Sequence, residues 1–174
     1  MTVGGMRRRL RTHLALVILV TVLGVSAIAA ANDGATIRQA IEGARAQDTR
    51  LADTQVGVRV RDGEVILFGS VRLYLQKMLF EQLAWRTVGV TEVDSEIRVE
   101  PVHRLPSAAI ERQIRRIIKE HERLHGSGLN VRVVGGRVYL SGSFHDPSDV
   151  MFLKHRVAEI EGVVAITIDP KFAV

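Results

Sequence analysis

Two fourteen-residue stretches of this chain follow nearly the same pattern, 73 residues apart. VRVRDGEVILFGSV begins at Val58, and VRVVGGRVYLSGSF begins at Val131. Shifting the sequence by 73 aligns it with itself from about residue 35 onward, and the identical pairs are mainly hydrophobic residues and glycines. Core positions and special backbone positions are the ones that a duplicated fold preserves. The chain is therefore predicted to contain one fold twice.

Each copy shows the same order of predicted elements. Apolar residues at helical spacing, such as Ile37 and Ile41, open the first copy. An alternating stretch, a turn with glycine and a returning stretch then predict a β-hairpin. A second helix is expected over residues 73–87, and about 148–160 in the second copy, before a last strand. The order is α-β-β-α-β, twice, and the two prolines of PVHRLP mark residues 101–106 as a linker.

The repeated residues carry a family resemblance. The V-x-V-x-x-G-x-V-x-L-x-G hairpin, a helix, a GV pair and a final strand resemble the BON domain of bacterial envelope proteins. This resemblance implies an α+β fold with two tandem αββαβ domains, over residues 34–100 and 107–174, each a three-stranded sheet on two helices. Six glycines are expected to occupy turns, bulges or close backbone approaches. They are Gly63, Gly69, Gly89, Gly136, Gly142 and Gly162.

The first thirty-one residues differ in kind from the rest. Arginines up to Arg11 precede an uncharged run, Leu14 to Ala31, which ends in small residues. This order predicts either a secretory signal peptide over residues 1–31 or an uncleaved inner-membrane anchor. In both cases the positive flank places the remainder outside the cytoplasm, facing the periplasm.

This predicted leader, residues 1–31, also explains most of the net charge of +5. Removing its four arginines from the 24 basic residues leaves 20, against 19 acidic ones. Bulk charge therefore gives no support for nucleic-acid binding. The chain has no cysteine, which excludes disulfides and a lipid-accepting N-terminal cysteine.

One stretch, HERLH from His121 to His125, matches the H-E-x-x-H pattern of zinc hydrolases. The first copy reads DTRLA at the equivalent place, and a third ligand is lacking where the longer form of the motif requires one. A solvated helix end is the favoured interpretation. The sequence predicts no catalytic site, no metal and no cofactor.

The predicted helix from Ser107 to Leu124 has a basic face. Four cations recur at spacings of four, three and four, and Arg115 flanks them. Such a face suits an anionic lipid surface. The alternative is an ordinary solvated face, since Glu111 can pair with Arg115 and Arg116 with Glu120. The candidate lipid-binding residues are Arg112, Arg115, Arg116, Lys119 and Arg123.

The helix LYLQKMLFEQLAW has more apolar surface than its own sheet needs. Tyr74, Leu79 and Trp85 are the surplus residues, and they are expected to contact the second domain, a partner or a membrane.

The resemblance implies no enzymatic activity and a role in phospholipid attachment and envelope integrity. The sequence therefore predicts a non-catalytic envelope protein that binds phospholipid or envelope components and supports membrane integrity or osmotic stress tolerance. Its expected partners are an anionic phospholipid surface or envelope proteins, with self-association open. The alternative function is an oligomerising scaffold of an envelope or secretion assembly.

Overall fold

A computed structural model describes residues 33–125 and 128–172. The predicted leader, residues 1–31, lies outside the described residues. Within the described ranges no helix is both long enough and apolar enough to span a bilayer.

The first unit begins with a helix over residues 33–47. It continues with η1 (Thr49–Leu51), β1 (Gln55–Arg61), β2 (Glu64–Val71), α2 (Tyr74–Arg86) and β3 (Glu92–Val99). The second unit contains α3 (Ser107–Glu120), β4 (Asn130–Val134), β5 (Arg137–Phe144), α4 (Pro147–Ala158) and β6 (Ala165–Phe172). The predicted α-β-β-α-β order is confirmed in both copies.

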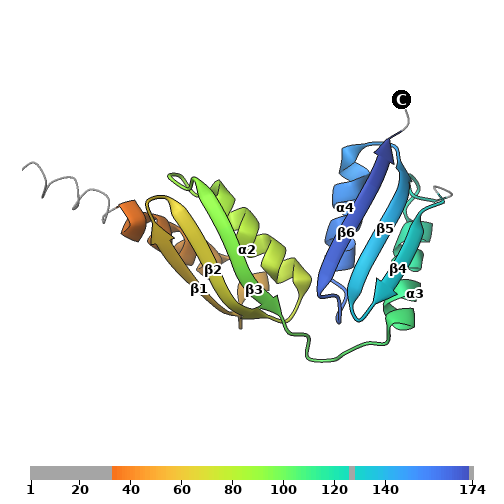
Figure 1. Ribbon diagram of the computed structural model, residues 1–174, viewed down its shortest axis with the longest axis horizontal. Helices are drawn as coiled ribbons and strands as arrows, with labels where there is room; N and C mark the ends of the chain where they lie inside the picture. The colour runs from red at the N-terminus through yellow and green to blue at the C-terminus, as the bar shows by residue number, and fades with distance from the viewer. Residues whose placement is uncertain (1–32, 126–127, 173–174) are drawn as a thin grey trace, which may run out of the picture.

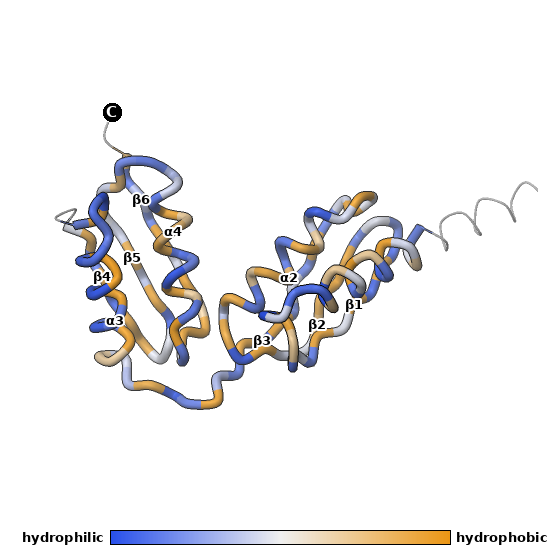
Figure 2. Tube along the Cα trace, turned by 180° about the vertical axis from the view of Figure 1, so that it is seen from behind, coloured by the Kyte–Doolittle hydropathy of each residue, from blue (hydrophilic) through white to orange (hydrophobic). Residues whose placement is uncertain are grey.

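Each unit contains one three-stranded sheet. The strand orders are β1-β2-β3 and β4-β5-β6, with the hairpin pair antiparallel and the last pair parallel. The helices cover one face of each sheet and leave the other open (Figure 1). Figure 2 shows the same two layers from the helix side. The units lie side by side, and both open faces lie on the same side of the molecule (Figure 1).

The hairpin turns follow the prediction. Asp62 and Gly63 have φ values of 50° and 85°, and Gly135 and Gly136 have 55° and 79°. Two consecutive positive φ angles are what a tight hairpin turn requires. All six glycines singled out in the sequence have positive φ.

The two units have separate hydrophobic cores built from equivalent residues. Ile37, Ile41 and Leu51 are buried in the first, and their counterparts 73 residues later are buried in the second. A few residues connect the cores: Ala158 of α4 packs with the first cluster, and Tyr74 and Ile166 contact both. Each domain thus has its own core, and a narrow apolar contact joins them.

One predicted boundary is wrong. The helix expected to reach Leu124 ends at Glu120, and residues 121–125 form a turn. His121 caps the helix with extended backbone, and its carbonyl accepts from the N–H groups of Leu124 and His125 at 3.0 and 2.9 Å. Leu124 is fully buried, as its counterpart Leu51 is in η1. Burying this leucine takes precedence over continuing the helix.

Candidate functional site

The outward face of α3 is the strongest candidate for a binding surface. Ile110 and Ile114 are fully buried and point toward the sheet. Residues advance about 100° around a helix, so Arg112, Arg116 and Lys119 fall within about 60° of one another, opposite those isoleucines. All three are exposed. The helix therefore turns a basic face directly away from its sheet, and this set is called the α3 basic face below.

The α3 basic face is electrostatically unsatisfied. Arg112, Arg116 and Lys119 form no ion pair with any described residue. The predicted pair of Arg116 with Glu120 is therefore not seen. Arg115 differs, because its guanidinium contacts Glu111 at 2.7 Å and donates to the carbonyl of Val131 at 3.4 Å. Arg115 therefore joins α3 to β4, and its charge is already paired with Glu111.

Arg123 does not belong to the basic face, which corrects the sequence prediction. It lies in the turn after α3, and its guanidinium contacts Asp149 at 2.7 Å and Asp146 at 3.2 Å. The Asp149 side chain is completely buried, and neither of its oxygens has a hydrogen bond from the described residues. Arg123 is the one described cation that neutralises this carboxylate. Arg123 therefore holds the turn after α3 against the start of α4.

The first unit has a neutral residue at the position equivalent to Asp149. Gln76 stands 73 residues before Asp149, and its amide donates to the carbonyl of Arg50 at 2.9 Å. Its carbonyl accepts from the N–H groups of Arg72 and Leu73. Neither Gln76 nor Asp149 was predicted as a structural site from the sequence. The signal was a buried helix position that reads Gln in one copy and Asp in the other.

Two partly exposed carboxylates have a lowered pKa, which favours their ionised form. Hydrogen bonds from Ser148, the residue after Pro147, lower the pKa of Asp146, which caps α4. The side chain of Arg50 likewise lowers the pKa of Asp48, which caps η1. Both carboxylates stabilise local backbone, as N-terminal caps do.

The HERLH stretch does not form a zinc site. Its residues lie in the turn after α3, so the two histidines do not share one helical face. The ring of His121 packs on that of Phe152, with 4.1 Å between centroids. Among the described residues no cluster of three metal-ligating side chains occurs.

Tyr74 and Trp85, two of the three surplus residues on α2, have different surroundings. Tyr74 lies between the cores, and the backbone N–H of Ile166 donates to its hydroxyl. Trp85 is 58 % exposed, and its place in an interface stays a prediction. Leu79, the third, is 8 % exposed and belongs to the first core. The expectation of surplus surface is therefore wrong for Leu79, because α2 rotates it toward its own sheet.

Replacing Tyr74 with Phe should loosen the contact between the units. Burial, with Glu81 adding to it, raises the pKa of Tyr74. A raised folded-state pKa contributes stability that is complete below the ordinary value of about 10 and is lost as pH rises through the folded value. We expect Tyr74→Phe to cost about 1 kcal/mol at pH 7. Urea unfolding should show the gap to the wild type closing above pH 10; a constant gap would contradict this role.

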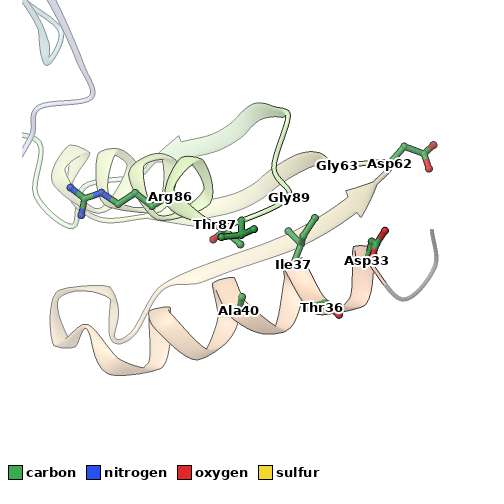
Figure 3. A pocket seen from close by; sticks show the side chains of 10 residues that line it. Asp33, Thr36, Ile37, Ala40, Asp62, Gly63, Arg86, Thr87 and Gly89 are labelled. Atoms are coloured by element: carbon green, nitrogen blue, oxygen red, sulfur yellow. The ribbon is translucent and has the colours of Figure 1, made fainter. Parts of the chain in front are cut away.

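A groove of about 870 Å³ lies between the helix over residues 33–47 and the end of α2. It is lined by Asp33, Thr36, Ile37, Ala40, Asp62, Gly63, Arg86, Thr87, Val88 and Gly89. Its charged side chains do not converge: Asp33 and Asp62 lie at one end, and Arg86 extends away at the other (Figure 3). This geometry does not assemble a nucleophile, a base and an oxyanion site.

Comparison with known families settles what kind of module this is. The BON domain model matches the chain twice, over residues 32–101 and 106–169. This chain belongs to the BON domain family. Each match covers one unit of the structure, so the helix 33–47 to β3 and α3 to β6 are its two BON domains.

Other similarities are more distant. An uncharacterized protein in the gshII 5′ region of Anaplasma centrale is 28 % identical over 120 residues, covering 64 % of this BON protein and 80 % of that one. Two structures of CdsD, a structural protein of the type III secretion system of Chlamydia trachomatis, align at 10 % and 14 % identity with TM-scores of 0.34 and 0.29. They cover 80 % and 79 % of this chain, which spans 66 % and 62 % of theirs. Such low scores carry no conclusion about assembly.

Proposed function

We propose that this protein is a non-catalytic envelope component that attaches to anionic phospholipid through the α3 basic face and supports membrane integrity under osmotic stress. The observation that carries the proposal is the set of three exposed cations, Arg112, Arg116 and Lys119, with no ion pair among the described residues. A cation that has no internal partner is free to bind an external anion. Its helix packs on β4 and α4, so only the basic side is open.

The size of the effect fits a reversible attachment. Each basic residue near an anionic bilayer contributes about 1 kcal/mol, so three contribute about 3 kcal/mol at low salt. This favours the bound state by about two orders of magnitude. The first domain offers less: Arg45, on the equivalent helix, donates to the carbonyls of Val56 and Thr54 at 3.1 and 2.8 Å. Lipid attachment is therefore assigned to the second domain.

The domain boundaries and location complete the proposal. Residues 1–31 direct the chain out of the cytoplasm as a signal peptide or an inner-membrane anchor, and both domains face the periplasm. Residues 101–106 form the linker, and Glu161 of the second domain accepts a hydrogen bond from the N–H of His103 at 3.1 Å. An anchor would add to the attachment, because it keeps α3 close to the bilayer surface.

The test is co-sedimentation of residues 32–174 with vesicles. Every described residue of the two cores lies between Ile37 and Ile168, so this fragment keeps both folded domains. We expect binding to vesicles with phosphatidylglycerol, no binding to phosphatidylcholine, and loss of binding at high salt. The triple variant Arg112→Gln, Arg116→Gln, Lys119→Gln should bind at least tenfold more weakly. Arg123 stays unchanged, because its loss would disturb the fold.

A matched control removes the same charge elsewhere. Arg38, Arg86 and Arg104 are exposed and lie outside α3, and changing all three to Gln should leave binding nearly unchanged. Equal loss in both triple variants would show attraction by net charge and reject a site on α3. Absence of binding to any vesicle would reject the proposed function.

A further inference from the structure

The open face of each sheet is unusual for a surface in contact only with water. Residues alternate along a strand, so those that point away from the helices can be read from the register. In the first domain Ile66 and Phe68 form the middle of that face. In the second, Tyr139 is 38 % exposed, and Val134, opposite Arg137, is 54 % exposed. Apolar side chains rimmed by charge are typical of a binding surface.

The strand residues of the two open faces differ in the sign of their net charge. On the first, Glu64 stands beside Glu92, Ile66 beside Asp94, and Phe68 beside Glu96. None of these four carboxylates forms an ion pair with a described residue. Three arginines share this face: Arg61 stands opposite Glu64, Arg98 lies on β3, and the Arg59 guanidinium lies over the Phe68 ring, 4.4 Å from the centroid. Four carboxylates against three arginines leave the strand residues of this face with a net charge of −1.

The second open face has fewer carboxylates at the equivalent positions. Arg137 stands where the first domain has Glu64, and Ala165 and Thr167 replace Glu92 and Asp94. Arg137 and Arg132 have no ion pair with a described residue, and Arg132 lies over the Tyr139 ring at 5.1 Å. Lys171 is a third cation on this face, and Asp169 is the single carboxylate among its strand residues, so their net charge is +2.

The complementary faces cannot meet within one molecule, because they lie side by side and point the same way (Figure 1). We propose that a second copy of this chain covers them, the first domain of each copy resting on the second domain of the other. A two-fold axis between the domains makes both contacts at once and closes the assembly as a dimer. This pairing is independent of the α3 basic face, which lies on the other side of the second domain.

The area is sufficient for a specific contact. The strands contain 7, 8 and 8 residues in the first domain and 5, 8 and 8 in the second. At about 3.3 Å per residue and about 4.8 Å between strands, the faces measure roughly 360 and roughly 330 Å². Both faces of two copies give roughly 1,400 Å² of total buried surface, which lies within the range of stable interfaces.

The test is sedimentation velocity on residues 32–174 over a range of concentrations and salt. We expect a dimer that weakens as salt rises. Two variants reverse one face each: Glu64→Arg with Asp94→Arg, and Arg132→Glu with Arg137→Glu. Each should weaken its own dimer at least about a hundredfold, because like charges then meet. Mixing the two should restore a dimer, since both contacts in the mixed pair again join opposite charges.

The mixing experiment also shows that both variants remain folded. The triple variant of the α3 basic face should dimerise like the wild type, so failure of lipid binding and failure of pairing are separate results. A wild type that stays monomeric at low salt and high concentration would overturn the pairing. A dimer unaffected by either reversal, or variants that do not pair when mixed, would overturn it equally.

Discussion

Arg123→Gln should destabilise the second domain by about 3 kcal/mol, far more than loss of a surface ion pair. The change leaves the Asp149 carboxylate, which is completely buried, without its cation. Removing one partner of a buried pair costs about 3–5 kcal/mol, and the lower end applies because the Arg123 side chain is 52 % exposed. Urea unfolding followed by circular dichroism should show an earlier transition of the second domain.

The repeat supplies a matched control for this prediction. Arg50 is the counterpart of Arg123, but its side chain pairs only with Asp48 on the surface. Arg50→Gln should therefore change stability by less than about 1 kcal/mol. Adding Asp149→Gln to Arg123→Gln should recover most of the loss, because it reproduces the neutral arrangement of Gln76. Equal effects of the two arginine changes would contradict a structural role for Arg123.

Gly69→Ala should destabilise the first domain by at least about 3 kcal/mol. Gly69 has a φ of 119°, and a Cβ there would lie 1.9 Å from the carbonyl oxygen of Gln55. A backbone atom cannot rotate away, so β1 would have to shift from β2. Trp85, the single tryptophan, lies in this domain, and its fluorescence should report the earlier unfolding.

Two other glycines calibrate this effect. At Gly142, the counterpart of Gly69, the nearest atom to a Cβ is the flexible end of Leu129 at 2.9 Å, so Gly142→Ala should cost less. Gly43 lies in the helix over residues 33–47 with open space around it, and Gly43→Ala should stabilise by up to about 1 kcal/mol. Similar losses at Gly69 and Gly43 would contradict the steric explanation.

The fold could be predicted because the repeat marks core and turn positions twice. Positions such as Ile41 and Ile114 are apolar for the same reason in both copies, and hairpin glycines have positive φ. The end of α3 could not be predicted, because helical spacing continues through Arg123 in the sequence. The turn forms because Leu124 must reach the core and Arg123 must reach Asp149, and both contacts depend on the tertiary structure.

The candidate site was predictable only in part. Spacing placed Arg112, Arg116 and Lys119 on one helical face, since that depends on the helix alone. It could not show that Arg115 and Arg123 have internal partners. The charge difference between the open sheet faces was also hidden, because it appears only once strand register assigns each residue to a side.

In the second domain, α3 and the open sheet face lie on opposite sides of one two-layer unit. Two copies joined sheet to sheet would therefore carry their α3 helices on the two outer surfaces of the pair. Such a dimer has two lipid-binding surfaces on opposite sides, whereas a monomer has one. A monomer can only coat an anionic vesicle, but the pair can cross-link vesicles. The order of sheet and helix layers in this 19.2 kDa chain therefore has a consequence for membranes. With sheet-to-sheet pairing, the protein would hold two membranes at a fixed spacing; without it, the protein would only coat one surface.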